Sequence, residues 1–169
     1  SESGGVLGGA VAVGTGRGGN VTISAANAIT VSDPESAVST TTFGNGAGGD
    51  ISLSAKQVNV QNGGRVTSES GGVLGGAVAV GTGSGGVVSI SASDTITVSG
   101  QNSTVSTSTF GDGAAGDISL DANQVNVQNG GRVASESGGV LGGAVAVGTG
   151  SGGNVPISAA DAITVSDPR

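Results

Sequence analysis

Residues 49–70 read GDISLSAKQVNVQNGGRVTSES, and the same sequence returns at residues 116–137 with three substitutions. Apolar and polar residues alternate in Ile51-Ser52-Leu53 and in Val58-Asn59-Val60, which places the apolar side chains of each triplet on one face of a strand. Gly and β-branched residues dominate the stretch, and both disfavour helix. The sequence therefore predicts short strands separated by turns.

The whole chain is one repeat array over residues 1–169. Residues 1–67 and 68–134 match at roughly three quarters of their positions, and residues 135–169 begin a third copy. A period of this length is typical of solenoids, whose units bury their apolar faces only by stacking on their neighbours. Because the chain begins in the middle of a repeat, we expect it to be a fragment of a longer protein.

Each 67-residue unit contains two related halves, and each half contains three short strands. The first strands begin at Val21, Ile51, Val88, Ile118 and Val155, alternately 30 and 37 residues apart. We predict an all-β fold, a parallel β-helix of about five coils with two coils per unit; three shorter coils per unit are the alternative. The Val, Ile and Leu residues are expected to form internal ladders, and the Ser, Thr and Asn residues between them to face solvent.

Corners of the coil need turn residues. Asn62-Gly63-Gly64, Asn129-Gly130-Gly131 and Gly44-Asn45-Gly46 are expected to supply backbone with positive φ there.

The string GGVLGGAVAVGTG occurs at residues 4–16, 71–83 and 138–150. One interpretation makes it an extended side of the coil that adds to the core, with Phe43 and Phe110 stacked near Val80 and Val147. The other makes it a protruding apolar ridge that contacts another chain, since contiguous exposed apolar surface marks interfaces. The candidate chain-chain contact residues are Val73, Leu74, Ala77, Val78, Val140, Leu141, Ala144 and Val145.

Composition excludes several classes of function. The chain has a formal net charge of −7 and only five scattered basic residues, so neither nucleic acid nor an anionic membrane surface is an expected partner. No apolar run is long enough to span a bilayer, so we expect no membrane insertion. Gly is abundant at 36 residues, but a charged fraction of 10% and a mean hydropathy of +0.19 argue against disorder.

No catalytic constellation is visible. The chain has no His and no Cys, which removes the commonest general base and the thiol nucleophile. A carbohydrate-active β-helix would need paired carboxylates, and Asp117 and Asp121 are the nearest approach to a pair. Ser54 replaces Asp121 in the first unit, so the pair is not a property of the repeat. We therefore predict that the protein is not an enzyme.

Two further ligand types are weighed against plainer explanations. GNGAGGDIS (44–52) and GDGAAGDIS (111–119) are similar to the glycine-Asp nonapeptide of calcium-binding β-rolls, but each stands alone rather than in tandem. We expect no cofactor, with calcium at Asp112 or Asp117 as the alternative. Thr-rich segments at 39–42 and 106–109 suggest an ice-binding face, which Glu69 and Glu136 in the intervening halves would interrupt.

Repeated patterns such as GGNVTISAANAITVS (18–32) and GDISLSAKQVNVQNGGRVTSES (49–70) resemble the repeat regions of filamentous haemagglutinin-like exoproteins. These are large secreted bacterial proteins, many exported by two-partner secretion. The resemblance covers essentially the whole chain and implies a right-handed parallel β-helical shaft outside the cell. It implies adhesion, aggregation or biofilm formation, with a host or neighbouring cell surface as partner, and it assigns no site residues.

The sequence therefore leaves two functions open. The first is a non-catalytic shaft of a large bacterial surface adhesin. The second is a repeat of a self-associating extracellular filament or sheath, in which GGVLGGAVAVGTG packs chain against chain. Lateral or end-to-end homo-oligomers are expected because unpaired strand edges at the ends of a stack invite further pairing.

Overall fold

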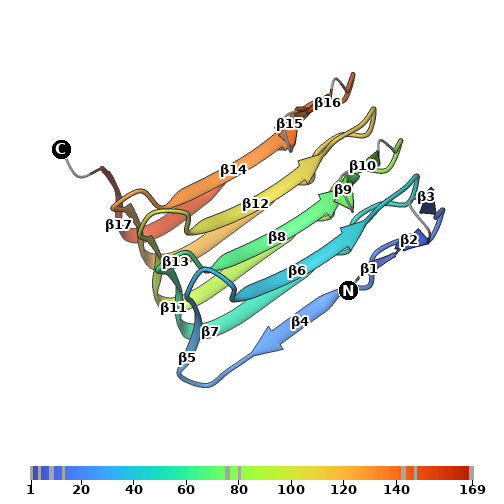
Figure 1. Ribbon diagram of the computed structural model, residues 1–169. Helices are drawn as coiled ribbons and strands as arrows, with labels where there is room; N and C mark the ends of the chain where they lie inside the picture. Colours follow the sequence, from blue (N-terminus) through green and yellow to red (C-terminus); the bar gives the residue numbers. More distant parts are fainter. Residues whose placement is uncertain are drawn as a thin grey trace.

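The computed structural model describes the protein over residues 2–3, 5–7, 10–12, 14–74, 77–79, 81–141, 144–146 and 148–167 (Figure 1). Within these ranges the fold is all-β: strands β1 to β17 follow one another along the chain and no helix occurs. Over the same residues there is accordingly no helix of the length and apolarity that crossing a membrane requires.

A six-stranded sheet runs along one side of the stack, in the order β17-β13-β11-β7-β4, with β5 also paired to β7. All of its neighbours are parallel, and Val21, Ile51, Val88 and Ile118 lie in register on successive strands. The 30- and 37-residue spacing of the sequence is therefore the spacing of strand pairing. The strands are β4 (Val21–Ser24), β5 (Ala28–Ser32), β7 (Ile51–Gln61), β11 (Val88–Ser99), β13 (Ile118–Gln128) and β17 (Ile157–Ser166).

A five-stranded parallel sheet faces it, in the order β1-β6-β8-β12-β14. Short turns join the two sheets, and glycine-rich segments return the chain to the next strand of the first sheet (Figure 1). This arrangement of parallel strands is compatible with a β-helix. The strands are β1 (Glu2–Ser3), β6 (Ala37–Thr42), β8 (Arg65–Ser70), β12 (Thr104–Thr109) and β14 (Arg132–Ser137).

The interior holds the aliphatic ladders that the alternation predicts. Ile96 lies against Val58 and Val125 on the neighbouring strands, and all three side chains are fully buried. Each fully buried Val, Ile or Leu contributes roughly 1.5–3 kcal/mol relative to exposure. The two sheets are therefore joined through one continuous core, to which Val66 and Val105 of the five-stranded sheet also belong.

The predicted first and second strands are continuous from β7 onward. Ser93 and Asp94 together lie opposite the single residue Lys56, so a bulge bends β11 without ending it. Only in the first half do β4 and β5 remain separate. The predicted strand start at Val155 is also wrong: β17 begins at Ile157, because Pro156 has no N–H to donate to the ladder.

The expectation that Ser and Thr side chains face solvent was wrong for the five-stranded sheet, because alternate hydroxyl side chains of its strands point inward. Thr40, Ser68 and Thr107 are completely buried. The hydroxyls of Thr40 and Ser68 both donate to the Gly49 carbonyl oxygen, over 2.7 and 2.8 Å, and the Gly86 N–H donates to Ser68 Oγ. The interior is thus aliphatic against one sheet and hydrogen-bonded against the glycine-rich segments. An exposed Thr array for ice is not formed by these residues.

Glycines of successive glycine-rich segments stack directly on one another. A Cβ on Gly83 would overlap the carbonyl oxygen of Gly46, and a Cβ on Gly113 would overlap that of Gly83. Close backbone approach therefore requires glycine at these corners. The expected positive φ is found at Asn62 (53°) and Gly63 (89°), but it is absent from Gly44-Asn45-Gly46, where that expectation was wrong.

Candidate functional site

The repeated string GGVLGGAVAVGTG forms antiparallel hairpins outside the two parallel sheets. Val73 pairs with Val78 and Val140 pairs with Val145, so the expected extended side of the coil is not what these residues form. The hairpins follow the strands of the five-stranded sheet at one end, where Figure 1 shows them along the same edge of the molecule. Their strands are β2 (Gly5–Leu7), β3 (Ala10–Ala12), β9 (Gly72–Leu74), β10 (Ala77–Ala79), β15 (Gly139–Leu141) and β16 (Ala144–Ala146).

A glycine with left-handed backbone conformation immediately precedes the hairpins that begin with β9 and β15. Gly71 and Gly138 both have φ of +79°. Each is fixed to the preceding strand of the sheet, because Gly71 N–H donates to the Thr42 carbonyl over 2.7 Å and Gly138 N–H donates to that of Thr109 over 2.8 Å. The local sequence thus ends the parallel strand and starts the hairpin at the same point of each repeat.

All eight predicted contact residues lie in these hairpins, and the structure brings them together in pairs by backbone register. Leu74 pairs with Ala77, and Leu141 with Ala144. Their side chains, and Val80 and Val147 with the predicted stacking on Phe43 and Phe110, lie outside the described residues. Each of these hairpin strands is paired only with the other strand of its hairpin in the described sheets.

The string is identical in its three copies, at residues 1–16, 68–83 and 135–150 when the flanking Ser-Glu-Ser is included. The next position already differs, with Arg17, Ser84 and Ser151. Many other exposed positions differ between units as well. The string that forms the hairpins is therefore one of the parts of the repeat that recur without change.

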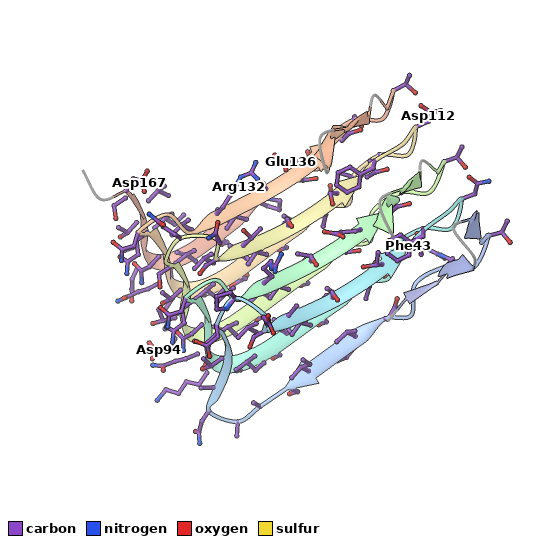
Figure 2. The ribbon with its side chains drawn as sticks, viewed as in Figure 1. Phe43, Asp94, Asp112, Arg132, Glu136 and Asp167 are labelled. Atoms are coloured by element: carbon purple, nitrogen blue, oxygen red, sulfur yellow. The ribbon has the colours of Figure 1, made fainter. Side chains whose placement is uncertain are left out.

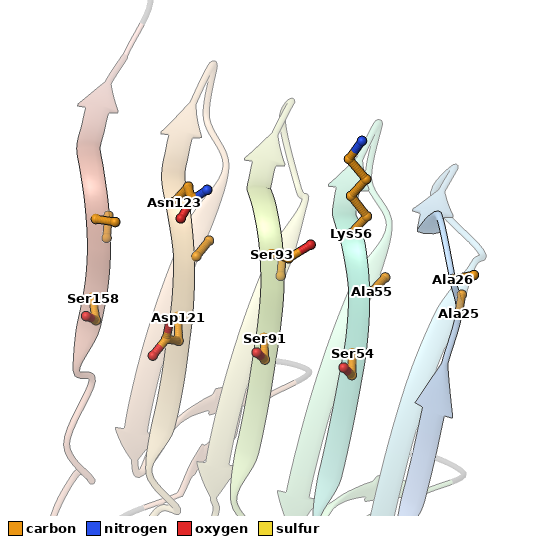
Figure 3. Close-up of a pocket in the computed structure, with 14 residues that line it drawn as sticks. Ala25, Ala26, Ser54, Ala55, Lys56, Ser91, Ser93, Asp121, Asn123 and Ser158 are labelled. Carbon is orange, nitrogen blue, oxygen red and sulfur yellow. The ribbon is translucent and has the colours of Figure 1, made fainter.

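A shallow groove of about 710 Å³ runs across the bend of the six-stranded sheet (Figure 3). Alanines such as Ala55 and Ala122 line it from successive strands, and Ser54, Ser91, Asp121 and Ser158 form a polar row across the strands. Lys56 and Asp121 are its charged residues. A single carboxylate without a second acid beside it offers no acid–base pair for hydrolysis.

The other candidate carboxylates accept hydrogen bonds from the neighbouring segment of the stack. Asp50 Oδ1 accepts the Val87 N–H over 2.8 Å, and Asp117 Oδ1 accepts the Asn154 N–H over 2.7 Å. Asp112 Oδ1 accepts both the N–H and the hydroxyl of Thr149. Among the residues with described positions, no group of three or more His, Cys, Asp or Glu side chains could hold a metal ion.

Rows of opposite charge on the outer face of the five-stranded sheet were missed by the sequence reasoning. Arg65 and Glu69 lie on one face of β8, and Arg132 and Glu136 on the same face of β14. Burial raises the pKa of the Glu69 carboxyl, and Arg65 opposes this by lowering it. The signal was present: the inward parity of Val66 continues to Ser68 and Ser70, which leaves the charged residues outside.

Comparison with known proteins returned no match: no family model, no curated protein and no solved structure is significantly similar to this chain.

Proposed function

We propose that this chain is part of a non-catalytic, right-handed parallel β-helical shaft of a large bacterial surface adhesin. The carrying observation is the parallel register that joins strands 30 and then 37 residues apart along the whole described six-stranded sheet. Together these steps span one 67-residue repeat, which supports two coils per repeat and about five coils in the chain. Right-handed connection of parallel strands is the nearly universal rule, and it supports the handedness.

Stiffness is the property that the contacts favour. Each glycine-rich segment lies directly on the previous one, and hydroxyl groups such as those of Thr40 and Ser68 link it to the opposite sheet. Asp50 and Asp117 add side-chain bonds from one segment to the next. A stack held on every side in this way lengthens with each repeat without changing its cross-section, as a spacer requires.

The location and role outside the cell rest on the resemblance to filamentous haemagglutinin-like exoproteins. That resemblance supports a secreted shaft that carries a binding region toward a host or neighbouring cell, in adhesion, aggregation or biofilm formation. The net charge of −7 is in keeping with partners other than nucleic acid.

Electron cryomicroscopy of native cells, with an antibody against the repeat, tests this function. We expect labelled thin rods that project from the cell surface and stand apart from one another. Label confined to the cytoplasm would contradict a surface shaft, and continuous fibres built from many chains would favour the second function below.

The second function is a self-associating extracellular filament or sheath. Its specific support is the row of hairpins, which stand outside the parallel sheets, contain only Gly, Ala, Val and Leu over residues 71–80, and repeat without change. A two-stranded hairpin alone is marginal in water, so packing against another chain would stabilise it.

The variant Val73→Asp/Val140→Asp tests the filament. Fibre formation, measured by sedimentation and microscopy, is expected to be lost because charge enters the hairpin contact. Thr30→Asp/Gln124→Asp is the control, since it adds the same two charges at exposed positions outside the hairpins. Equal fibre formation by all three proteins would exclude the hairpins as the chain-chain contact.

A further inference from the structure

The outer face of the five-stranded sheet carries two parallel rows of opposite charge. Arg65 of β8 and Arg132 of β14 both align with Thr104 of the intervening strand β12, and Glu69 and Glu136 both align with Ser108. The arginine row thus lies toward the beginning of the strands and the glutamate row toward their end. In Figure 2, Arg132 and Glu136 project from the outer side of β14.

The surface between the rows is made of small residues. Thr67, Ser106 and Ala134 are aligned with one another midway between the arginine and glutamate rows. None of these side chains is large enough to keep a second sheet face at a distance. Each complete pair of one arginine and one glutamate is neutral, as for Arg65 with Glu69 and Arg132 with Glu136, and Glu2 of β1 extends the glutamate row by register. Two copies can therefore meet over β8 to β14 with as many positive as negative side chains.

We propose that two copies of this chain pair side by side through this face, parallel and in register, with the arginine row of each copy opposite the glutamate row of the other. The occupant follows from the charges, because a face with one positive and one negative row is complementary to itself. A two-fold axis along the stacking direction reverses the strands and places Arg65 opposite Glu69 of the partner copy.

The alternative two-fold arrangement is disfavoured by the same charges. An axis parallel to the strands would leave each row at its own end and place arginine opposite arginine and glutamate opposite glutamate. Like charges placed opposite one another cost several kcal/mol across an interface. The rods therefore pair with their stacking directions parallel.

Existing contacts leave room for this partner. Arg132 and Glu136 form an ion pair within β14 but remain 57% and 46% exposed, so each can accept a second partner of opposite charge. Arg65 donates to the Pro34 carbonyl over 3.0 Å, which ties its guanidinium to the turn that precedes β6. Glu69 lies between Thr41 and Ser108 with burial that raises the pKa of its carboxyl, and a facing arginine would offset that cost.

The strength of pairing is set by repeat number. A six-residue strand is about 20 Å long and two coils rise about 9.6 Å, so each repeat offers roughly 190 Å² of this face. A standard stable interface needs about 800 Å² per partner, or about four repeats. Two copies of the present chain therefore pair weakly, and covalent capture is the appropriate measurement.

The chain has no cysteine, so an introduced thiol is the only one that can react with a cross-linker. Ala134→Cys is placed on the middle row, where Ala134 is partly exposed, and a short bismaleimide joins thiols that face each other. Parallel pairing in register predicts 134–134 links. Antiparallel pairing with the sheets overlapped carries residue 134 of β14 to a different strand of the partner copy, so the absence of 134–134 links would overturn the proposal.

Charge variants test complementarity in the Ala134→Cys background. Arg65→Glu/Arg132→Glu is expected to lower the yield of 134–134 links about tenfold. Mixing it with Glu69→Arg/Glu136→Arg should restore the yield between the two unlike chains. The control Arg17→Glu/Lys56→Glu makes the same change in net charge at exposed residues away from this face, and should leave the yield unchanged.

An equal loss of links in the control would reduce the effect to general repulsion and overturn the proposal. If a charge variant fails to fold, as judged by circular dichroism, the protein with unaltered arginines and glutamates still tests the proposal. The yield of 134–134 links must fall as salt is raised, because exposed charge pairs are screened. A salt-independent yield contradicts the pairing. The single-rod shaft does not depend on this result, since it is tested by imaging.

Discussion

A single valine interrupts a ladder of side-chain hydrogen bonds at the start of the six-stranded sheet. Asn20 Oδ1 accepts the Asp50 N–H over 3.0 Å, and Asp50 Oδ1 in turn accepts the Val87 N–H. Val87 has no acceptor to offer Asp117, although Asp117 continues the ladder to Asn154. Val87 is also 44% exposed, so it gains little from burial.

Val87→Asn is therefore expected to stabilise the protein by about 1 kcal/mol, the usual net value of one hydrogen bond. The free energy of unfolding in urea measures it. Val87→Ala is the control, because it removes the apolar side chain without adding an acceptor. A gain shared equally by both variants would assign the effect to lost apolar exposure rather than to the ladder.

Glu69 and Glu136 occupy the same position of the repeat but different surroundings. Glu69 lies between two strands, β6 and β12, and its carboxyl pKa is raised above 4.5 by burial. Glu136 is on the outermost described strand of its sheet and is paired with Arg132. Neighbouring strands, not sequence, therefore decide what each carboxylate contributes.

Glu69→Gln is expected to raise the free energy of unfolding at neutral pH. A raised pKa means that the folded state disfavours the carboxylate, so stability from this group is present below 4.5 and is lost as pH rises through the folded pKa. The advantage of Glu69→Gln over the parent should thus shrink as pH falls toward 4.5. Glu136→Gln, which removes an exposed ion pair, should cost at most about 1 kcal/mol. A lower free energy of unfolding for Glu69→Gln than for the parent protein at neutral pH would contradict the unfavourable burial of this carboxylate.

The glycine-rich segments are elements in their own right, although they form no strands. Their glycines are needed for different reasons at different positions. At Gly83 a Cβ would meet the backbone oxygen of Gly46, which cannot move aside. At Gly48 the nearest atom to a Cβ is the rotatable hydroxyl of Ser68, at 2.7 Å, and the second repeat carries Ala115 at the equivalent position.

Gly83→Ala is accordingly expected to destabilise the fold by about 3 kcal/mol, the upper range for overpacking, and Gly48→Ala by less than about 1 kcal/mol. Thermal and urea unfolding of the two variants measure the difference. Equal costs would show that the close backbone stack is not the reason for glycine at these corners.

Buried hydroxyl groups link the five-stranded sheet to the glycine-rich segments. Thr107 Oγ1 donates to the Gly116 carbonyl and lies 3.0 Å from Ser135 Oγ. Thr107→Val keeps the shape and removes the donor, so it should cost about 1–2 kcal/mol. Thr30→Val, on the exposed face of β5, should be nearly neutral in the same unfolding measurement. A neutral Thr107→Val would mean that these bonds contribute nothing net.

The strands and their stacking were predictable from the sequence, because local alternation and the repeat period specify them. The alternation around Ile51 and Val58 predicts strands with one apolar face, and the 67-residue period predicts parallel stacking of equivalent positions. Inward serine and threonine were not predictable from alternation alone, because Thr40 is as suited to a solvent-facing strand position as to a hydrogen bond with Gly49. Gly, Ala and Val in the repeated string fit an extended side and a hairpin equally well, and only the register of Val73 with Val78 separates the two.

The whole molecule is a stack of parallel strands that grows longer with each repeat. The steps of 30 and 37 residues in strand pairing together span one 67-residue unit, which in the proposed β-helix corresponds to two coils, and the glycines of successive segments lie directly on one another. Every function proposed above depends on this geometry, whether the rod acts alone, pairs through its charged rows or joins others through its hairpins.

Small-angle X-ray scattering of the chain, and of the same chain with one added copy of residues 68–134, measures how much each repeat lengthens the stack. With two coils per unit at the usual spacing of parallel strands, the rod should lengthen by about 9.6 Å while its cross-sectional radius stays the same. A gain of about 14.4 Å would mean three coils per unit, and growth in cross-section without added length would contradict the stacked rod altogether.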